Sequence, residues 1–432
     1  MKTRLVHIAI FMIFGASVAF AQLSEKVIFS FNLTDGNLPD GGLVADTQGN
    51  LYGTTAYNGG KHGFGNVYEL SPDGNGGWTE TDLYDFTGGT DGAWPIDTLI
   101  LDHAGNLYGT AQVGGQGICT NTGQGCGVVF ELVRGQSGWT EKVLFSFVPG
   151  QVKGVIPAGG LIFDKAGNLY GTTWAPGVEG GPLAVKRNSS GANSYWGCTL
   201  PGCGGTVYEL SPTANGWKET DLYAFNGTSD GSASVASLIF DRAGNLYGTT
   251  QFGGTTGCTS GYGCGLVFKL MPSNGGWSET VLHAFTGNDG AYPTANLLFD
   301  QSGNLYSTTS GGGSSGNGTV FALLSGQHDR ATVLHSFTGG SDGGTPFAGV
   351  IADKSGDLIG TANQGGANWG VVYALRLVNG HVIEKVLHTF TFGADGENPY
   401  APVIFGPHGH LYGTTQSGGS QGGHGTVFEI IP

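Results

Sequence analysis

The stretch "GNLYGTT" at residues 49–55 decides the fold of this chain, because it returns unchanged at 167–173 and 244–250. Variants of it recur along the chain and can be anchored at Tyr52, Tyr108, Tyr170, Tyr247, Tyr306, Ile359 and Tyr412. The steps between these anchors are 56, 62, 77, 59, 53 and 53 residues. A period of this size indicates a repeat architecture in which one structural unit occurs seven times.

Four short blocks follow in the same order within each repeat, and the second repeat shows them plainly. They are "TDLYDF" (81–86), "DTLILD" (97–102), "NLYGTA" (106–111) and "GVVFEL" (127–132). Each block is rich in β-branched and aromatic residues and is bounded by Gly, Asp, Asn or Pro, which is typical of a strand. The second and third blocks are joined by "HAG", a tight hairpin connection with Gly where we expect a positive φ.

Four short strands per unit, repeated seven times, predict an all-β fold, namely a seven-bladed β-propeller with four-stranded blades. The chain ends support this prediction. "KVIFSF" (26–31) matches the outermost strand of a unit, whereas the C-terminal "GTVFEI" (425–430) matches the strand before it. We therefore expect the N-terminal strand to complete the last blade and to pair an edge that would otherwise stay open. Residues 22–432 would then form a single propeller domain.

Residues 1–21 have the composition of a secretory signal peptide. Lys2 and Arg4 precede an apolar run, and Ala19 and Ala21 are the small residues expected before a cleavage site. The apolar run is short for a membrane span, so we expect no membrane span. We expect the protein to be secreted or periplasmic, and to be a monomer. Removing these residues takes away two cations and no acids, so the net charge of −15 becomes −17. A protein this acidic repels phosphate backbones, which excludes nucleic acid as an expected partner.

The loops fall on two faces when the strands of a blade are lettered A to D from the axis outward. The A–B and C–D hairpins share the lower face, whereas the D–A links and the Gly-rich B–C loops share the upper face. Most of the sequence variation between repeats lies in the upper loops. Since variable loops on a rigid scaffold are the usual place for binding sites, we look for functional residues there.

The order of the repeated words "GNLYGTT", "GTVFEL" and "DGxxP" resembles the GloVer tandem repeat of exported bacterial proteins, whose members are described as choice-of-anchor proteins. The resemblance covers nearly all of the chain after residue 21 and rests on several words in a set order. It implies an exported repeat protein. It implies no catalytic residues, because the family carries no established activity that could be transferred.

The six cysteines form three close pairs, each within the B–C loop of one repeat. The pairs are Cys119 with Cys126, Cys198 with Cys203 and Cys258 with Cys264. In an exported protein such pairs predict three local disulfides. The alternative is a zinc site, but the spacings of six, four and five intervening residues do not suit CxxC ligation.

Asp-Gly recurs in the D–A links of six repeats and permits two interpretations. The aspartates are Asp35, Asp91, Asp230, Asp289, Asp342 and Asp395. In the first interpretation Asp caps a turn and Gly takes an unusual backbone angle. In the second, the carboxylates form a rim on the upper face that binds calcium or sugar hydroxyls. Four of them are our candidate ligand-binding acids, namely Asp91, Asp289, Asp342 and Asp395.

Aromatic residues near these links differ from repeat to repeat and supply the candidates Trp94, Tyr292 and Tyr400. Exposed rings beside carboxylates would suit a polysaccharide, and the alternative is packing between neighbouring blades. The third repeat carries a long insert at 175–203. This insert contains the one locally basic and aromatic patch of the chain, formed by Lys186, Arg187 and Trp196. Its alternative interpretation is a disulfide-pinned loop without a ligand.

The sequence favours a binding or surface-interaction module whose ligand is a polysaccharide or another exported protein. The second hypothesis is a hydrolase or lyase that acts on polysaccharide with upper-face carboxylates as general acid and base. The third is a purely structural surface protein. Two carboxylates that converge near the axis, one of them desolvated, would favour the enzyme.

Overall fold

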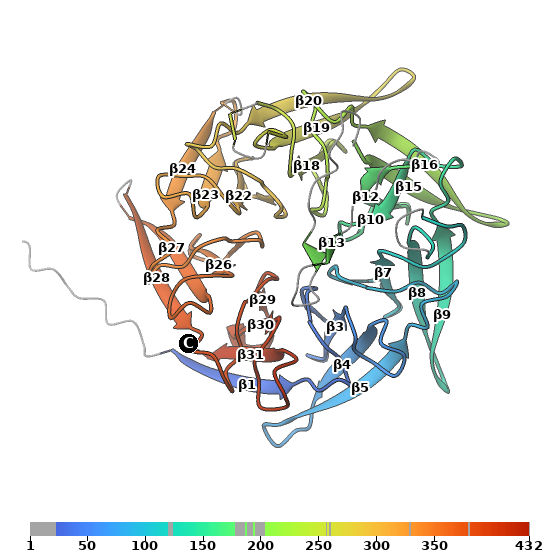
Figure 1. The fold of residues 1–432 in the computed structure, drawn as a ribbon, viewed down its shortest axis with the longest axis horizontal. Helices are drawn as coiled ribbons and strands as arrows, with labels where there is room; N and C mark the ends of the chain where they lie inside the picture. Colours follow the sequence, from blue (N-terminus) through green and yellow to red (C-terminus); the bar gives the residue numbers. More distant parts are fainter. Residues whose placement is uncertain are drawn as a thin grey trace, which may run out of the picture.

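The computed structural model describes residues 23–431 apart from 120–123, 178–185, 188–192, 195–203, 256, 259–260, 328–329 and 379–380. Within these residues the chain forms seven antiparallel blades arranged in a ring (Figure 1), together with a separate two-stranded sheet of β13 (Lys186–Arg187) and β14 (Asn193–Ser194). The prediction of an all-β, seven-bladed propeller is confirmed. The predicted signal peptide lies outside the described residues. No helix in the described part of the chain is long and apolar enough to cross a membrane.

The strands of the first three blades are given from the innermost outward. Blade 1 consists of β2 (Val44–Ala45), β3 (Leu51–Thr55), β4 (Asn66–Pro72) and β5 (Trp78–Asp85). Blade 2 consists of β6 (Ile100–Leu101), β7 (Leu107–Ala111), β8 (Val128–Gly135) and β9 (Gly138–Ser146). Blade 3 consists of β10 (Gly154–Pro157), β11 (Ile162–Phe163), β12 (Leu169–Pro176), β15 (Thr206–Thr213) and β16 (Gly216–Ala224), with β10 and β11 both paired to β12.

The remaining four blades follow the same plan. Blade 4 consists of β17 (Ile239–Phe240), β18 (Leu246–Thr250), β19 (Leu266–Ser273) and β20 (Gly276–Ala284). Blade 5 consists of β21 (Leu298–Phe299), β22 (Leu305–Thr309), β23 (Thr319–Leu323) and β24 (Ala331–Ser336). Blade 6 consists of β25 (Ile351–Ala352), β26 (Leu358–Ala362), β27 (Val371–Val378) and β28 (His381–Thr389). Blade 7 consists of β29 (Ile404–Phe405), β30 (Leu411–Thr415), β31 (Thr426–Ile431) and β1 (Ser24–Ser30), and a 3-10 turn η1 (Pro407–Gly409) joins β29 to β30.

The N-terminal strand β1 closes the ring, as the sequence predicts. It pairs antiparallel with β31, from Ser24 opposite Ile431 to Ser30 opposite Thr426. The last blade is therefore built from both ends of the described chain, and its outer edge is covered in the same way as in the other blades. Figure 1 shows β1 as the blue strand lying outside β31.

The repeated phrase is explained by the A–B hairpin on the lower face. In blade 1, Asp46 Oδ1 accepts hydrogen bonds from the backbone of Gln48 and Asn50, both at 2.9 Å, and Asp46 Oδ2 accepts one from Asn50 Nδ2 at 2.8 Å. The Tyr52 hydroxyl donates to Asp46 Oδ2 at 3.1 Å. The same Asp, Asn and Tyr side chains make this hairpin in blades 2 to 5. The words recur because each polar side chain satisfies a hydrogen bond in a tight turn.

Neighbouring blades are joined by an edge-to-face contact between two aromatic rings. Phe86, which follows β5, meets Phe130 of β8 at a centroid distance of 5.1 Å. Equivalent contacts exist at all seven interfaces and include Phe31 with Tyr68, which joins blade 7 to blade 1. The repeated Gly of the second strand makes room for these rings, since a Cβ at Gly109 would lie 2.6 Å from Phe130 Cζ. Such pairs contribute about 0.5–1.5 kcal/mol each beyond their buried area.

The strand boundaries differ from the predicted ones at both edges of a blade. The innermost strands keep only two ladder residues, such as β6, because the residues before them belong to the D–A link. The outermost strands are longer than predicted, because the C–D hairpin continues to the turn, as in β5. Every C–D pair also has a register shift, for example where Val67 faces Tyr84 but Tyr68 faces Asp82. This bulge is invisible in the sequence pattern and changes the direction of the side chain that follows it.

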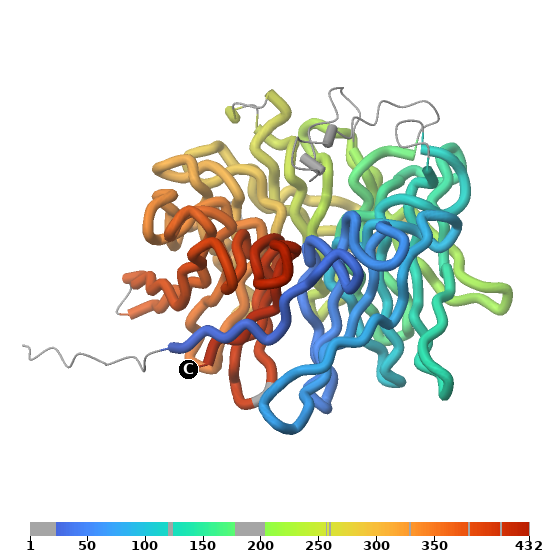
Figure 2. Tube along the Cα trace, turned by 60° about the horizontal axis from the view of Figure 1, so that its bottom comes forward, coloured from blue at the N-terminus to red at the C-terminus, as the bar shows by residue number. Residues whose placement is uncertain are grey.

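The upper face is assembled by contacts between each D–A link and the preceding B–C loop. Trp94 donates its backbone N–H to Phe64 O at 2.9 Å and adopts a positive φ of 61° directly before Pro95. Each link has a non-glycine residue in this conformation, and these are Leu38, Trp94, Ile156, Ala233, Tyr292, Thr345 and Asn398. Their recurrence fixes seven links in one geometry and gives the upper face a rigid frame. Figure 2 shows the loops and hairpins at the two ends of the ring.

Candidate functional site

The Asp-Gly pairs of the D–A links form turns that are closed by the aspartate side chain. In the link after β5, Asp91 Oδ2 accepts a hydrogen bond from Thr87 N at 2.7 Å, and Asp91 Oδ1 accepts one from Thr87 Oγ1 at 2.6 Å. Equivalent turns are closed by Asp230, Asp289, Asp342 and Asp395, with donors at Asn226, Thr286, Thr338 and Thr391. The turn interpretation of these acids therefore explains why they recur.

A tyrosine or histidine of strand D adds a hydrogen bond to four of these turns, those of Asp91, Asp230, Asp289 and Asp342. In the turn of Asp395 the corresponding His388 Nε2 lies 3.7 Å from Asp395 Oδ2. The Tyr84 hydroxyl donates to Asp91 Oδ2 at 3.1 Å, and in blade 4 His283 Nε2 takes the same place, 2.9 Å from Asp289 Oδ2. The sequence suggests only packing for this histidine, because sister blades have aromatic residues at its position. Burial alone would raise the pKa of Asp289, but hydrogen bonds from His283 and Thr286 lower it to about 2. His283 thus has two roles: its ring packs, and its Nε2 is hydrogen-bonded to Asp289, which closes the turn.

The recurring aspartates do not converge into a metal-binding cluster of side chains in the described part of the chain. Over those residues, no three His, Cys, Asp or Glu side chains are grouped so that they could hold a metal ion. The turn acids are instead distributed one to a link, and each accepts hydrogen bonds from its own link. Calcium therefore enters the proposals below only as a variable of the binding experiment.

The structure places the aromatic candidates of the sequence in different surroundings. Trp94 is 7% exposed, and its ring packs against Tyr57 at a centroid distance of 5.1 Å. Tyr292 is half-buried, with its ring 5.8 Å from that of Phe252. Packing between loops therefore accounts for Trp94. Tyr400 is half-buried and belongs to the cluster described next.

The insert of blade 3 is described only in part. Lys186 and Arg187 form the short strand β13 (Lys186–Arg187), which pairs with β14 (Asn193–Ser194). The side chains of these two basic residues lie outside the described part of the chain. So do Trp196 and the cysteine pair Cys198 and Cys203.

Two further acids lie on the upper face where the D–A links turn into the innermost strands. Asp40 lies four residues before β2 and Asp97 three residues before β6, so they stand on neighbouring blades at the start of the first strand of each sheet. Asp40 Oδ1 accepts a hydrogen bond from Gln416 Nε2 of blade 7 at 2.8 Å. Asp97 Oδ2 accepts one from Thr110 Oγ1 at 3.1 Å. We call Asp40, Asp97 and the corresponding positions three or four residues before the innermost strands the inner rim.

The inner-rim acids are desolvated. Burial raises the pKa of Asp40 to about 7, despite the hydrogen bond from Gln416. Burial, with a smaller effect of the charge on Asp40, raises the pKa of Asp97 to about 8. Burial and then the nearby charges, those of Asp40 and Asp97 among them, also raise the pKa of the Tyr400 hydroxyl. The ring of Tyr400 stacks on Phe347 at 4.7 Å with 30° between the planes. Blades 6, 7, 1 and 2 thus contribute to one polar and aromatic cluster.

Comparison of the repeats could have revealed these acids in the sequence. The position of Asp97 is occupied in the other blades by Gly41, Gly159, Ala236, Ala295, Ala348 and Ala401. An acid at a position that otherwise requires only a small residue is not explained by the repeat. Asp40 and Asp97 each occur once, so neither belongs to the recurring Asp-Gly pattern.

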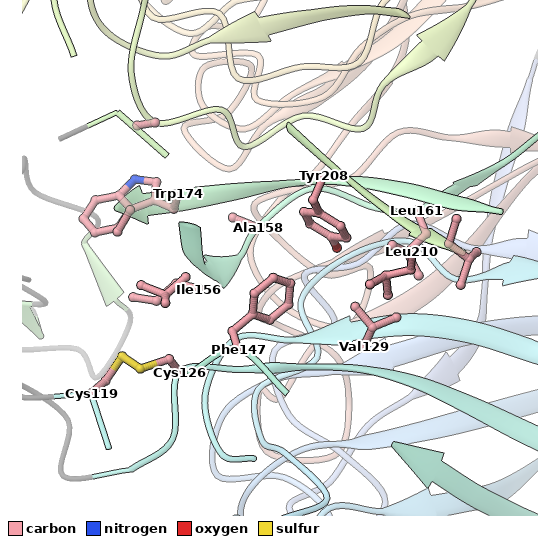
Figure 3. Close-up of a cluster of buried hydrophobic side chains, with 14 of the residues drawn as sticks. Cys119, Cys126, Val129, Phe147, Ile156, Ala158, Leu161, Trp174, Tyr208 and Leu210 are labelled. Atoms are coloured by element: carbon pink, nitrogen blue, oxygen red, sulfur yellow. A yellow bond between two sulfur atoms is a disulfide. The ribbon is translucent and has the colours of Figure 1, made fainter. Parts of the chain in front are cut away.

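Two of the three predicted disulfides are confirmed. Cys119 is bonded to Cys126 and Cys258 to Cys264, each within one B–C loop. Figure 3 shows the first of these beside Ile156 and Trp174, in the buried cluster between blades 2 and 3. The disulfides therefore stiffen loops of the upper face.

Comparison with known proteins agrees with the repeat. A family model described as the Gloeobacter/Verrucomicrobia repeat matches residues 13–186, 179–368 and 254–432. The chain belongs to this repeat family. The expected resemblance to the GloVer repeat is thereby confirmed. No curated protein matches the chain.

Several solved structures are similar to the chain at low sequence identity. A putative 6-phosphogluconolactonase from Bacteroides uniformis is 14% identical over 82% of this chain and 87% of its own, with a TM-score of 0.45. A protein of unknown function from Dyadobacter fermentans is 12% identical over 95% of this chain and 100% of its own, with a TM-score of 0.45. A gluconolactonase from Xanthomonas campestris is 13% identical over 77% of this chain and 94% of its own, with a TM-score of 0.34.

Proposed function

We propose that this chain is an exported module that binds a polysaccharide on its upper face, with the inner rim as the principal contact. The observation that carries the proposal is that Asp40 and Asp97 occur once each, at inner-rim positions where the fold itself does not require an acid. A feature of a single blade cannot be ascribed to the repeat. We therefore attribute Asp40 and Asp97 to ligand binding.

The chemistry of the inner rim suits hydroxyl groups. Since their pKa values are about 7 and about 8, Asp40 and Asp97 are partly protonated near neutral pH and can donate as well as accept hydrogen bonds. Phe347 and Tyr400 add apolar ring faces next to these groups. Polar groups at a few fixed positions beside aromatic rings are the usual composition of a small-molecule site. A neutral sugar uses both features.

A glycan array tests this proposal. The chain without residues 1–21 is applied with and without calcium, and both bound glycans and released products are read. Asp97→Ala introduces the residue of several sister blades and is expected to weaken binding at least tenfold. Thr90→Ala, which alters an exposed side chain of the same face, is the matched control and is expected to bind normally. Equal binding by both variants would disprove a contact at the inner rim.

The second candidate function is a hydrolase or lyase that acts on the bound polysaccharide. It is favoured by the raised pKa of Asp97, because a carboxyl that is protonated near pH 7 is suited to act as a general acid. Asp40 would then be the companion base. New reducing ends or unsaturated products on incubation with an array-positive glycan, lost in Asp97→Asn, would support the enzyme. Binding without products supports the binding module, and neither binding nor products supports a structural surface protein.

A further inference from the structure

Blade 6 carries larger residues at two upper-face positions that are glycine with positive φ in four of its sister blades. The residue two places after the phenylalanine that follows strand D is glycine with φ between 76° and 90° in four blades, at Gly88, Gly227, Gly287 and Gly339. In blade 6 this residue is Phe392, and its φ is 65°. The residue three places before strand C is glycine with positive φ at Gly63, Gly263, Gly316 and Gly423, whereas blade 6 has Asn368 with φ of 85°.

Phe392 is both strained and exposed. A positive φ is uncommon for a bulky side chain, and such a residue costs about 1–3 kcal/mol relative to a relaxed backbone. With 63% of its surface exposed, the ring recovers little of this cost by burial. Glycine at the same turn, as in sister blades, would avoid both penalties. The ring is therefore unfavourable for stability at this position, and a role in binding explains its presence.

The ring of Phe392 is held on top of a second ring. Trp369, in the B–C loop of blade 6, lies under it with a centroid distance of 4.7 Å and 35° between the planes. In blade 1 the corresponding Phe64 packs directly on Gly88, where an added Cβ would lie 2.7 Å from the ring. Blade 6 thus replaces a ring-on-glycine contact by a two-ring stack, and the upper ring presents a face to solvent.

The supports of this stack are rigid. Trp369 O accepts a hydrogen bond from Asn398 N at 2.8 Å, which anchors the loop to the next link. Asp395 Oδ2 accepts one from Thr391 N at 2.9 Å and closes the turn that carries Phe392. A pre-formed ring loses little conformational entropy when a ligand stacks on it.

We propose that Phe392 and Trp369 form a stacking platform for one neutral sugar ring of the polysaccharide, with the exposed Asn368 beside it as a hydrogen-bonding group for hydroxyls. The assignment rests on the proposed function for the class of ligand, but on residues distinct from the inner rim. A single exposed ring is far smaller than the apolar patch of several hundred Å² that marks a protein interface. A quaternary ammonium group would need an aromatic cage, whereas these rings are stacked on each other and offer one face.

Isothermal titration with neutral hexasaccharides of glucose, mannose and xylose tests the platform in the chain that begins at residue 22. Phe392→Gly restores the residue of the sister blades and is expected to weaken binding at least fivefold, while the melting midpoint stays the same or rises. Phe392→Trp retains a ring and is expected to bind like the parent protein. Binding by Phe392→Gly equal to that of the parent, or failure of the parent to bind any hexasaccharide at millimolar concentration, would overturn the platform. So would binding of tetramethylammonium instead of sugar.

The inner-rim variant separates this proposal from the proposed function. If Asp97→Ala loses binding and Phe392→Gly does not, the result supports the inner rim as the contact and refutes the platform. If Phe392→Gly loses binding and Asp97→Ala does not, the result supports the platform and refutes a contact at the inner rim. A drop in the melting midpoint of Phe392→Gly without any loss of affinity would assign the ring a structural role and refute the platform.

Discussion

The stability of the propeller should fall as the pH rises from about 5 to 8.5, because six blades carry a glutamate in the same half-buried position of the outermost strand. These residues are Glu25, Glu80, Glu141, Glu219, Glu279 and Glu384, and blade 5 has Ala331 there. Burial, and then the charge of neighbouring aspartates, raises the pKa of Glu141 and Glu279 to about 7 and that of Glu80 and Glu219 to about 8. Oε1 of Glu80 and Oε1 of Glu141 are buried and have no hydrogen-bond partner in the described structure.

The sign follows from proton linkage. A glutamate whose pKa is higher in the folded state than in the unfolded chain binds its proton more tightly when folded. Its stabilising contribution is therefore complete below about pH 4.5 and is lost as the pH rises through 7 to 8. Since these side chains remain partly exposed, we count about 1 kcal/mol for each rather than the full shift. Six sites then lower the free energy of unfolding by about 6 kcal/mol.

Calorimetry gives the measurement. Unfolding entropies of about 2.1 cal/mol/K per residue over roughly 400 residues convert 6 kcal/mol into a melting midpoint about 7 °C lower at pH 8.5 than at pH 5. A variant with all six glutamates changed to Gln should melt higher than the parent at pH 8.5 and match it at pH 5. Ala331→Glu, which adds the missing seventh acid, should lower the midpoint at pH 8.5 only. A sixfold variant that melts no higher than the parent at pH 8.5 refutes the reasoning.

Changes at three places test the packing of the blades and the closure of the ring. Gly109→Ala places a Cβ 2.6 Å from Phe130 Cζ, so we expect a loss of about 1–3 kcal/mol, measured as a lower midpoint in thermal denaturation; an unchanged midpoint would show that the ring can move aside. His283→Phe keeps the ring but removes the partner of Asp289, and should cost about 1–2 kcal/mol, whereas His283→Tyr should melt like the parent because tyrosine donates at this position in blade 1. Equal stability of the two variants would contradict the hydrogen-bonding role. Deletion of residues 23–30 exposes the edge of β31 and should give aggregation in size-exclusion chromatography; a monodisperse protein with the parent's melting midpoint would show that β1 is dispensable.

The repeat predicts much of the architecture but little of the site. Seven copies of "GNLYGTT" and its variants predict the number of blades, and the unmatched "KVIFSF" predicts the closing strand. These features are local, since a tight hairpin and a strand are encoded by residues a few positions apart. Two disulfides follow from spacing for the same reason. The bulge of the outermost strand is not encoded in this way, because it depends on the register between strands C and D.

The sequence by itself determined which residues repeat. The tertiary structure alone decided which of the non-repeating residues lie close together. Asp40 and Asp97 are 57 positions apart in the chain, and only the ring brings them together next to Tyr400. The strained conformation of Phe392 and its stacking on Trp369 likewise depend on two loops that the fold places side by side. A repeated sequence specifies one blade through local hydrogen bonds and packing, whereas a site on the upper face is made by side chains from different blades, whose proximity follows from closure of the ring.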